Sequence, residues 1–167
     1  MKLFKSKTDD LSVARDEKKD PVERSSAIAR LRFDGRAAEI EPLLVKMLRD
    51  QSFLLRRDAV VTLVGFWQKN QFVKTALEML QTDSDETVRS GAAYALAEFV
   101  AATGTDKQVV INSLSKQLER ETQPGVQEEC YKSLLKLVAP RKTLYSAESV
   151  FKRERDVDWN LLKSYLT

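Results

Sequence analysis

Few side chains in this sequence are of a type that could carry out chemistry. The chain has no histidine, which removes histidine-based triads, histidine metal ligands and the usual general base at neutral pH. The adjacent carboxylates Asp85 and Glu86 have the residue types of an acid–base pair. They lie where a helix is predicted to begin, and negative charge is favoured at that end of a helix. We therefore interpret them as capping residues.

Cys130 is the single cysteine, so it cannot form an internal disulfide. It stands where related segments of the chain have alanine, and no basic group adjoins it that would activate the thiol. These features favour a small buried core residue over a reactive one. We expect no catalytic residue, no metal ligand and no cofactor, and a protein that is not an enzyme.

Length and charge further restrict the class of protein to which this chain can belong. The 167 residues fit one domain, and 32% of them are charged with a net charge of only +3. Because basic and acidic residues are interspersed, the pattern disfavours a dedicated nucleic-acid binder. The first seven residues are too polar for a signal peptide, and no apolar run reaches the length of a membrane span. The sequence thus predicts a cytoplasmic protein with no membrane partner.

The chain contains a segment that recurs four times, with a small residue at its centre. The central residues are Ala27, Ala59, Ala92 and Cys130, at steps of 32, 33 and 38 residues. A period in this range is typical of a solenoid of stacked repeats. The four segments are Glu23–Leu31, Leu55–Leu63, Val88–Leu96 and Val126–Leu134.

Apolar spacing of three and four residues predicts helices throughout. They are expected in pairs, at 9–18 with 20–33, 37–49 with 52–68, 70–82 with 84–102, and 105–120 with 124–138. Start signals include Asp20 before Pro21, and candidate caps at Ser52 and Thr105. After Pro140 we expect a short helix from Ser146 to about Arg155 and a last one, capped by Asp156 or Asp158, through Leu166. The predicted organisation is an N-terminal segment at 1–19, repeats at 20–140 and a C-terminal extension at 141–167.

The stretch from Leu80 to Leu96 resembles the HEAT repeat, in the short form also found in phycobilin lyase relatives. The matching features are a leucine-rich first helix, an Asp-containing turn, Val88-Arg89, a small residue and Ala95-Leu96. Leu48-Arg49-Asp50 with Leu55-Arg56 gives a second unit, and the first and fourth units are degenerate. The resemblance implies a right-handed α-solenoid of about four HEAT-like hairpins with a C-terminal helical cap. It also implies structural roles for Arg56 and Arg89, with Asp50 and Asp83 as partners.

In such a stack the second helix of each pair lines the concave side. A helical wheel of about 100° per residue places several apolar residues there, away from the core. Exposed apolar patches mark interaction sites, and aromatic residues with arginine anchor protein interfaces. The predicted partner-binding residues are Arg57, Val61, Val64, Trp67, Tyr94, Tyr131 and Leu135.

The C-terminal segment offers another explanation of that apolar strip. It carries much apolar material, including Phe151, Trp159 and Tyr165, which could seal the last repeat or fold back over the strip. Homodimerisation could also cover it.

Three functions follow from these features. The leading hypothesis is a non-enzymatic protein-binding module, such as an adaptor, regulator, inhibitor or assembly factor. A nucleic-acid binder is the second, with phosphate contacts from basic residues of the concave side and the C-terminal segment. A bilin-lyase-like or chromophore-handling factor is the third, suggested only by the repeat subtype. The basic residues of the second hypothesis are Arg32, Arg36, Arg57, Lys132, Lys152, Arg153 and Arg155.

Overall fold

The computed structural model of the chain describes residues 7–35, 37–140 and 150–166, and every regular element within them is a helix. The predicted all-α class is thereby confirmed. Ser146, Arg36 and the proposed boundary at residue 141 lie outside the described residues. The elements are α1 (Lys7–Arg15), α2 (Pro21–Leu31), α3 (Ala37–Met47), α4 (Phe53–Val60), the π-helix η1 (Val61–Phe66), the 3₁₀-helix η2 (Asn70–Phe72), α5 (Val73–Thr82), α6 (Glu86–Thr103), α7 (Lys107–Arg120), α8 (Pro124–Val138), α9 (Arg153–Asp156) and α10 (Trp159–Lys163).

Local sequence explains most of the helix starts. The Asp20 carboxylate accepts the backbone N–H of Val22 at 2.7 Å, and the Asp85 carboxylate accepts that of Thr87 at 2.8 Å. Asp158, rather than Asp156, caps α10. Two expected caps are absent: the Ser52 side chain makes no capping hydrogen bond, and α7 begins after Asp106, not at Thr105. Asp106 has a left-handed backbone (φ 56°), which shifts the start of α7 by two residues.

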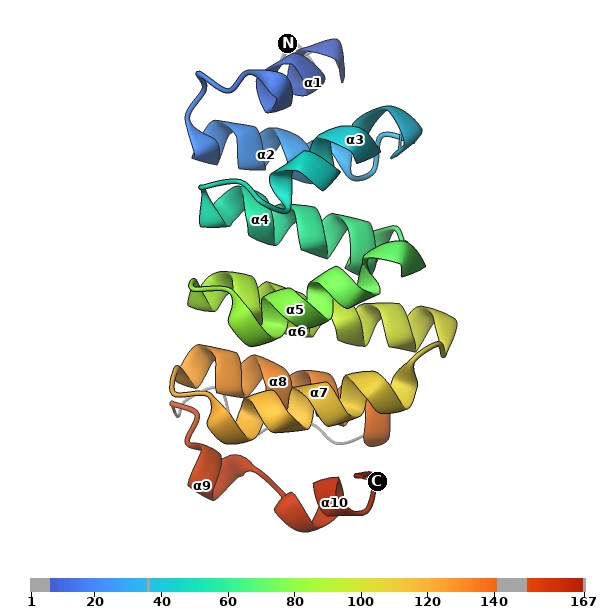
Figure 1. The fold of residues 1–167 in the computed structure, drawn as a ribbon, viewed down its shortest axis with the longest axis vertical. Coiled ribbons are helices and arrows are strands. Elements are labelled where there is room, and N and C mark those ends of the chain that lie inside the picture. Colours follow the sequence, from blue (N-terminus) through green and yellow to red (C-terminus); the bar gives the residue numbers. More distant parts are fainter. Residues whose placement is uncertain (1–6, 36, 141–149, 167) are drawn as a thin grey trace, which may run out of the picture.

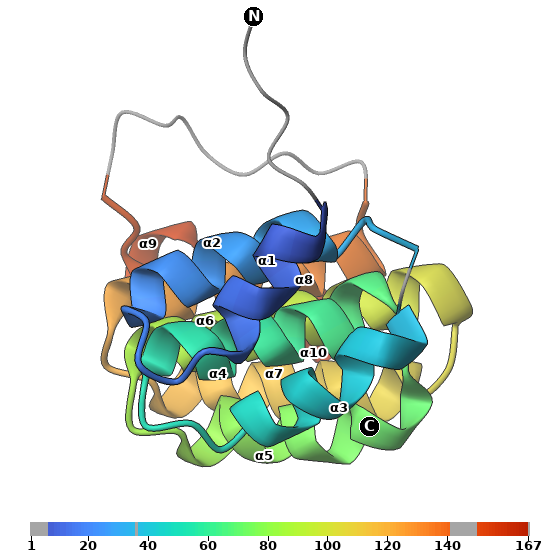
Figure 2. The same ribbon diagram turned by 90° about the horizontal axis from the view of Figure 1, so that it is seen from above.

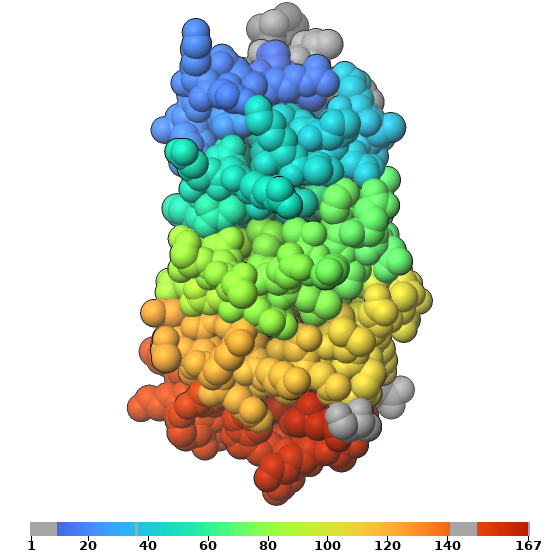
Figure 3. Space-filling model, viewed as in Figure 1, coloured from blue at the N-terminus to red at the C-terminus, as the bar shows by residue number. Residues whose placement is uncertain are grey.

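The helices form two layers. The first helices α3, α5 and α7 make one layer, and the second helices α2, α4, α6 and α8 make the other, as Figures 1 and 2 show. Successive hairpins stack along the long axis, visible as consecutive colour bands in Figure 3. Helix α1 packs on α2 at the amino end of the stack. This arrangement is an α-solenoid of helical hairpins, as predicted.

The recurring segment is the core of the stack. Its central residues Ala27, Ala59, Ala92 and Cys130 are fully buried, because they lie where neighbouring second helices approach each other. The leucines that end each segment are also buried and fill the wider gaps between helices: Leu31, Leu63, Leu96 and Leu134. The repeat pattern in the sequence is therefore a packing pattern, since no repeat can bury its apolar face without a neighbour.

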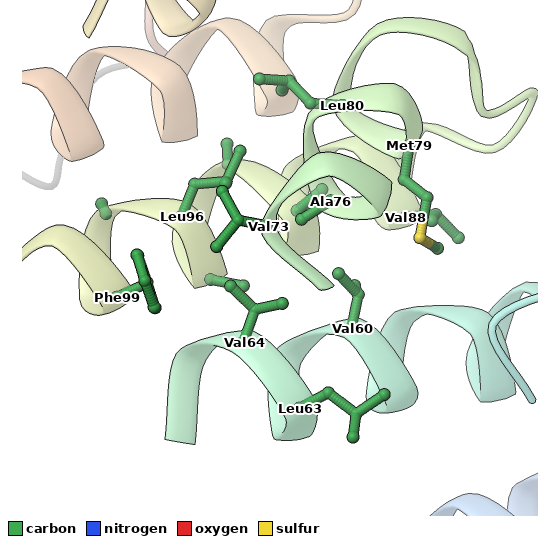
Figure 4. Packing of buried hydrophobic residues seen from close by; sticks show 14 of the residues in the cluster. Val60, Leu63, Val64, Val73, Ala76, Met79, Leu80, Val88, Leu96 and Phe99 are labelled. Carbon is green, nitrogen blue, oxygen red and sulfur yellow. The ribbon is translucent and has the colours of Figure 1, made fainter. Parts of the chain in front are cut away.

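The second helix of the second repeat changes its winding at Val61. Beyond α4 it continues as the π-helix η1, in which the Trp67 N–H donates to the carbonyl of Thr62, five residues back, at 2.9 Å. A π turn contains more residues than an α turn, so a wheel of 100° per residue misplaces the side chains that follow. Val64, predicted to be exposed, is fully buried and points toward Val73 and Leu96 (Figure 4). The prediction of exposure at Val64 is wrong for this reason.

The arginines at the start of the second helices form a ladder between repeats. Arg56 donates through Nε and Nη2 to both carboxylate oxygens of Asp83, at 2.9 and 2.8 Å. Arg89 does the same with Glu121, at 2.8 and 3.0 Å. Their structural role was expected, and so was Asp83 as a partner, but Glu121 was not, and the Asp50 carboxylate does not pair with either arginine. In each case the carboxylate comes from the turn of the following repeat. The turn just before each arginine supplies only backbone carbonyls: Arg56 donates to the carbonyl of Asp50, and Arg89 donates to that of Asp83, both at 2.9 Å.

The degenerate repeats fit the same ladder. Arg24 in the first repeat reaches the Asp50 carboxylate at 3.8 Å. In the last repeat Gln127 takes the arginine position and donates to the carbonyl of Glu121 at 2.6 Å. No further repeat follows among the described residues to supply a carboxylate there, so an amide that keeps only the carbonyl contact is sufficient. The departure from the repeat pattern at Gln127 thus marks the end of the ladder.

The C-terminal elements cap the last repeat. Helices α9 and α10 lie beyond α7 and α8 (Figure 1), where Arg153 donates to the carbonyl of Glu119 near the end of α7. Tyr131 is buried because it anchors this cap: its hydroxyl accepts the Asp158 N–H at 3.1 Å, and its ring lies 6.1 Å from that of Phe151. Leu135 is buried in the same core cluster. The predicted exposure of Tyr131 and Leu135 is therefore wrong, and at Tyr131 the reason is that the cap covers this end of the stack.

Candidate protein-binding surface

We call the side of α2, α4–η1, α6 and α8 that faces away from α3, α5 and α7 the second-helix face. It is the side predicted to be concave, and it lies behind the view in Figure 1. Of the seven predicted partner-binding residues, Arg57, Val61, Trp67 and Tyr94 keep exposed surface, whereas the other three are core. The continuous apolar strip expected from the sequence is therefore not present.

The structure does bring three of the predicted residues together around a groove. Residues of α4, α6 and α8 line this groove, which has a volume of about 280 Å³. Arg57 and Tyr94 are in its lining, and Val61 lies next to Gly91, another lining residue. A methyl group on Gly91 would lie 2.7 Å from Cγ of Arg57, so glycine is needed for Arg57 to lie across the helix. The lining consists of Arg57, Glu86, Thr87, Ser90, Gly91, Tyr94, Gly125, Val126 and Glu129.

Buried polar contacts hold Arg57 in place. Its guanidinium donates to the Asp58 carboxylate at 3.0 and 3.3 Å. Asp58 is itself buried and also accepts the hydroxyl of Ser25 from α2. The positive charge of Arg57 is thus matched by a carboxylate of its own helix.

Tyr94 lies near the centre of the face and retains 36% of its surface. Partial burial, followed by the neighbouring carboxylate of Glu98, raises the pKa of its hydroxyl. Glu98 forms an ion pair with Lys136 across α6 and α8, and Lys132 pairs with Glu128 at 2.6 Å. The face around Tyr94 is therefore a set of matched charges around one aromatic ring.

Glu129 departs from this pairing. Its carboxylate is half-buried and receives only a long hydrogen bond, 3.5 Å, from the hydroxyl of Ser133. Burial raises the pKa of Glu129. The charge of Lys132 and the Ser133 hydroxyl lower it, the carboxylates of Glu128 and Glu98 raise it, and the pKa stays above its ordinary value. The sequence did not identify Glu129 as a site residue, because a helical wheel does not show which carboxylates form ion pairs.

A second group of aromatic residues lies where α2 and η1 end. The guanidinium of Arg32 stacks 4.2 Å above the ring of Phe66, and Phe33 meets Phe66 edge-on at 5.6 Å. The Trp67 indole donates to the carbonyl of Arg32 at 3.0 Å. Phe33 is 74% exposed, an unusual position for a large apolar ring. Phe33 and Phe66 were not among the predicted residues.

The basic residues of the nucleic-acid hypothesis do not form a common stripe. Arg57 and Lys132 each pair with a carboxylate on their own helix, and Arg32 donates to the hydroxyl of Thr62. In the cap, Arg153 and Arg155 pair with Glu154 and Asp156. A phosphate backbone would have to compete with these carboxylates.

The remaining chemical candidates occupy structural positions. Cys130 is fully buried, and burial together with the carboxylates of Glu121 and Glu129 raises the pKa of its thiol above the ordinary value. The described residues contain no cluster of three side chains suited to hold a metal ion. Asp85 and Glu86 lie at the start of α6, where Asp85 caps the helix.

A larger groove, of about 900 Å³, lies at the turns of the first two repeats. Four of its five charged residues form two ion pairs, Lys46 with Glu17 and Arg24 with Asp50, and Arg49 forms none with a described residue. It therefore lacks the unmatched carboxylate that distinguishes the groove of the second-helix face.

Comparison with known proteins identifies the repeats. A family model described as HEAT repeats matches residues 8–97, just over half of the chain. No curated protein and no solved structure gave a match. Among the described residues, none of the helices is long and apolar enough to cross a membrane.

Proposed function

This chain belongs to the HEAT-repeat family, and from that premise we propose that it is a non-enzymatic module that binds a protein partner, as an adaptor, regulator, inhibitor or assembly factor. HEAT repeats commonly mediate protein–protein interaction. A stack of this kind presents an extended surface rather than a catalytic pocket. The sequence favours the cytoplasm as the place where the protein acts. The free, buried thiol of the single cysteine agrees with that reducing compartment.

The observation that carries the proposal is the groove beneath Tyr94 on the second-helix face. It combines an exposed aromatic ring, an arginine fixed by a buried carboxylate and a half-buried carboxylate with no strong partner. Aromatic and arginine side chains at partly desolvated positions dominate the binding energy of protein interfaces. A second exposed aromatic ring, Phe33, lies edge-on to Phe66 where α2 and η1 end.

The test compares two folded variants in affinity capture from a native lysate, followed by binding of the identified partner in purified form. Tyr94→Asp should reduce the affinity at least tenfold, because it replaces an exposed ring at the centre of the face with a charge. Val109→Asp is the matched control, since Val109 is 52% exposed on α7 in the other layer. Circular dichroism checks that both variants fold.

Equal binding by Tyr94→Asp and Val109→Asp would move the site away from the second-helix face. Recovery of only the chain itself would point to a homodimer. The two other hypotheses lack a specific observation in their favour, since the basic residues are paired with carboxylates and the described residues show no thiol or acid–base site for chromophore handling.

A further inference from the structure

Glu129 forms no ion pair within the part of the chain that the structure describes, and the charge of Lys132, which attracts it, is shared with Glu128. The two lysines that follow it on α8 are engaged elsewhere, Lys132 with Glu128 and Lys136 with Glu98. The hydroxyl of Ser133 has one proton, and its shorter contact is with the carbonyl of Ala93 at 3.2 Å, not with Glu129 at 3.5 Å. A half-buried carboxylate in this situation has lost water without gaining a full set of donors.

The other charged residues of the groove do not balance the negative charge of Glu129. Glu86, on the opposite wall, likewise forms no ion pair with a described residue. The only cation in the lining is Arg57, and Asp58 already matches its charge. The groove therefore carries two unmatched carboxylates, and the complementary ligand group is a cation.

The shape of the groove fits one long side chain. Two glycines line the groove: the side chain of Arg57 occupies the space beside Gly91, whereas a methyl group on Gly125 would meet nothing within 4 Å. The volume of about 280 Å³ lies just below the range of about 300–1,000 Å³ that holds whole small-molecule ligands. The ring of Tyr94 forms part of the wall, so a planar cation can pack against it.

We propose that this groove receives an arginine side chain of the protein partner, which pairs with Glu129 and packs against Tyr94. Arginine fits better than lysine because its fork of N–H donors can satisfy both oxygens of one carboxylate while its flat face stacks on an aromatic ring. The inference rests on the proposed function, since it names the chemistry by which the second-helix face recognises its partner.

The amino ends of α6 and α8 also adjoin the groove, and helix amino ends attract anions. At α6 this attraction is already used by the protein's own carboxylates, because Asp85 accepts two backbone N–H groups and Glu86 lies in the first turn. An anionic ligand would in addition face Glu86 and Glu129. The balance of charge thus favours the arginine.

The experiment is a titration of the ¹⁵N-labelled full chain with acetyl-Ala-Arg-Ala-amide, followed by NMR. Matched peptides carry citrulline, the neutral analogue of arginine, lysine or glutamate at the central position. We expect the arginine peptide to bind at least tenfold more tightly than the citrulline peptide, with shifts at the amides of residues 86–94 and 125–133. Glu129→Gln should abolish that difference.

Two further variants make the result specific. Gly125→Phe should block the groove and weaken binding of the arginine peptide at least tenfold, since the new side chain points into open space. Glu78→Gln removes the same charge as Glu129→Gln from an exposed position of α5, and it should leave binding unchanged.

The inference is overturned if the citrulline peptide binds as well as the arginine peptide, if the lysine or glutamate peptide binds best, or if Glu129→Gln keeps the preference for arginine. These outcomes test the arginine site and not the proposed protein-binding function. A partner that is lost by Tyr94→Asp but shows no arginine preference would leave the protein-binding function in place and remove only this inference.

Discussion

At the scale of single residues, the arginine–carboxylate ladder is the clearest case of one side chain holding two repeats together. The Glu121 carboxylate is almost fully buried, and the atoms around it donate five hydrogen bonds, from Arg89, Gln117, Thr122 and Gln123. Burial by itself would raise the pKa of Glu121, but these donors outweigh it and lower the pKa to about 2. The ion is thus satisfied in the folded chain and much less so in the unfolded one.

This shift predicts an acid-sensitive contribution to stability. Because the pKa of Glu121 is lower in the folded chain than in the unfolded chain, its stabilising effect is complete above about pH 4.5 and is lost as the pH falls toward about 2. Glu121→Gln should cost about 3 kcal/mol at pH 7, since it leaves Arg89 without its charge partner. Urea unfolding between pH 7 and pH 2.5 measures both effects.

The neighbouring Glu119→Gln is the control, because Glu119 is exposed. The loss of stability on acidification should be smaller in Glu121→Gln than in Glu119→Gln. Parallel pH profiles for the two variants would show that Glu121 does not carry this effect.

At the scale of elements, the π-helix η1 decides which side chains reach the second-helix face. It turns Val64 into the core and leaves Val61 half-buried beside Gly91. It also brings Gly65 so close to α6 that a methyl group there would lie 3.3 Å from the Cα of Ala95. The change of winding therefore serves the packing of η1 on α6.

The two valines should respond differently to the same substitution. Val64→Asp places a carboxylate in a fully buried apolar site and should cost several kcal/mol, enough to shift or abolish the unfolding transition. Val61→Asp should cost about 1 kcal/mol or less, as for other partly exposed positions. Urea unfolding followed by circular dichroism compares them. A similar cost at both positions would contradict the inward orientation of Val64.

Two glycines provide a second test at this scale. Gly65→Val should destabilise the protein by about 1–3 kcal/mol, because the added atoms meet the backbone of α6. Gly125→Ala should be neutral or stabilise by up to about 1 kcal/mol, since its methyl group meets nothing and alanine favours the helix. The unfolding midpoints in urea give both values. If Gly65→Val were as stable as the parent protein, the close approach of η1 and α6 would be disproved.

At the scale of the whole molecule, a stack of repeats must close its ends. Helix α1 covers the amino end, and the cap formed by α9 and α10 covers the other, where Phe151, Val157 and Leu162 join the core. The cap therefore buries the apolar end of the last repeat, just as each following repeat buries the end of the repeat before it. Among the described residues, the lining of the groove comes from α4, α6 and α8 and not from α9 or α10.

Ending the chain after Pro140 should thus cost several kcal/mol and promote self-association, because each buried apolar side chain of the cap contributes about 1.5–3 kcal/mol. Urea unfolding and light scattering on a sizing column measure these changes. Tyr131→Phe is the milder companion variant, since it removes only the hydroxyl that accepts the Asp158 N–H and should cost about 1 kcal/mol. A truncated chain that stays monomeric and equally stable would mean that the cap is not needed.

The sequence by itself determined the all-helical class, the pairing of helices and the core residues at the centre of each repeat. These features follow from apolar periodicity and capping residues, which act within one helix or one turn, as at Asp20 and Ala92. It also gave structural roles to Arg56 and Arg89, and it placed Arg57, Val61 and Tyr94 on one side of the stack.

Only the tertiary structure decided what that side contains. Three features depend on residues distant in the sequence or on packing against another helix: the winding of η1, the covering of Tyr131 by the cap, and the pairing of Arg89 with Glu121. The position of Glu129 outside the ion pairs of the described residues has the same origin, because a carboxylate is matched or unmatched only once every neighbouring helix is in place.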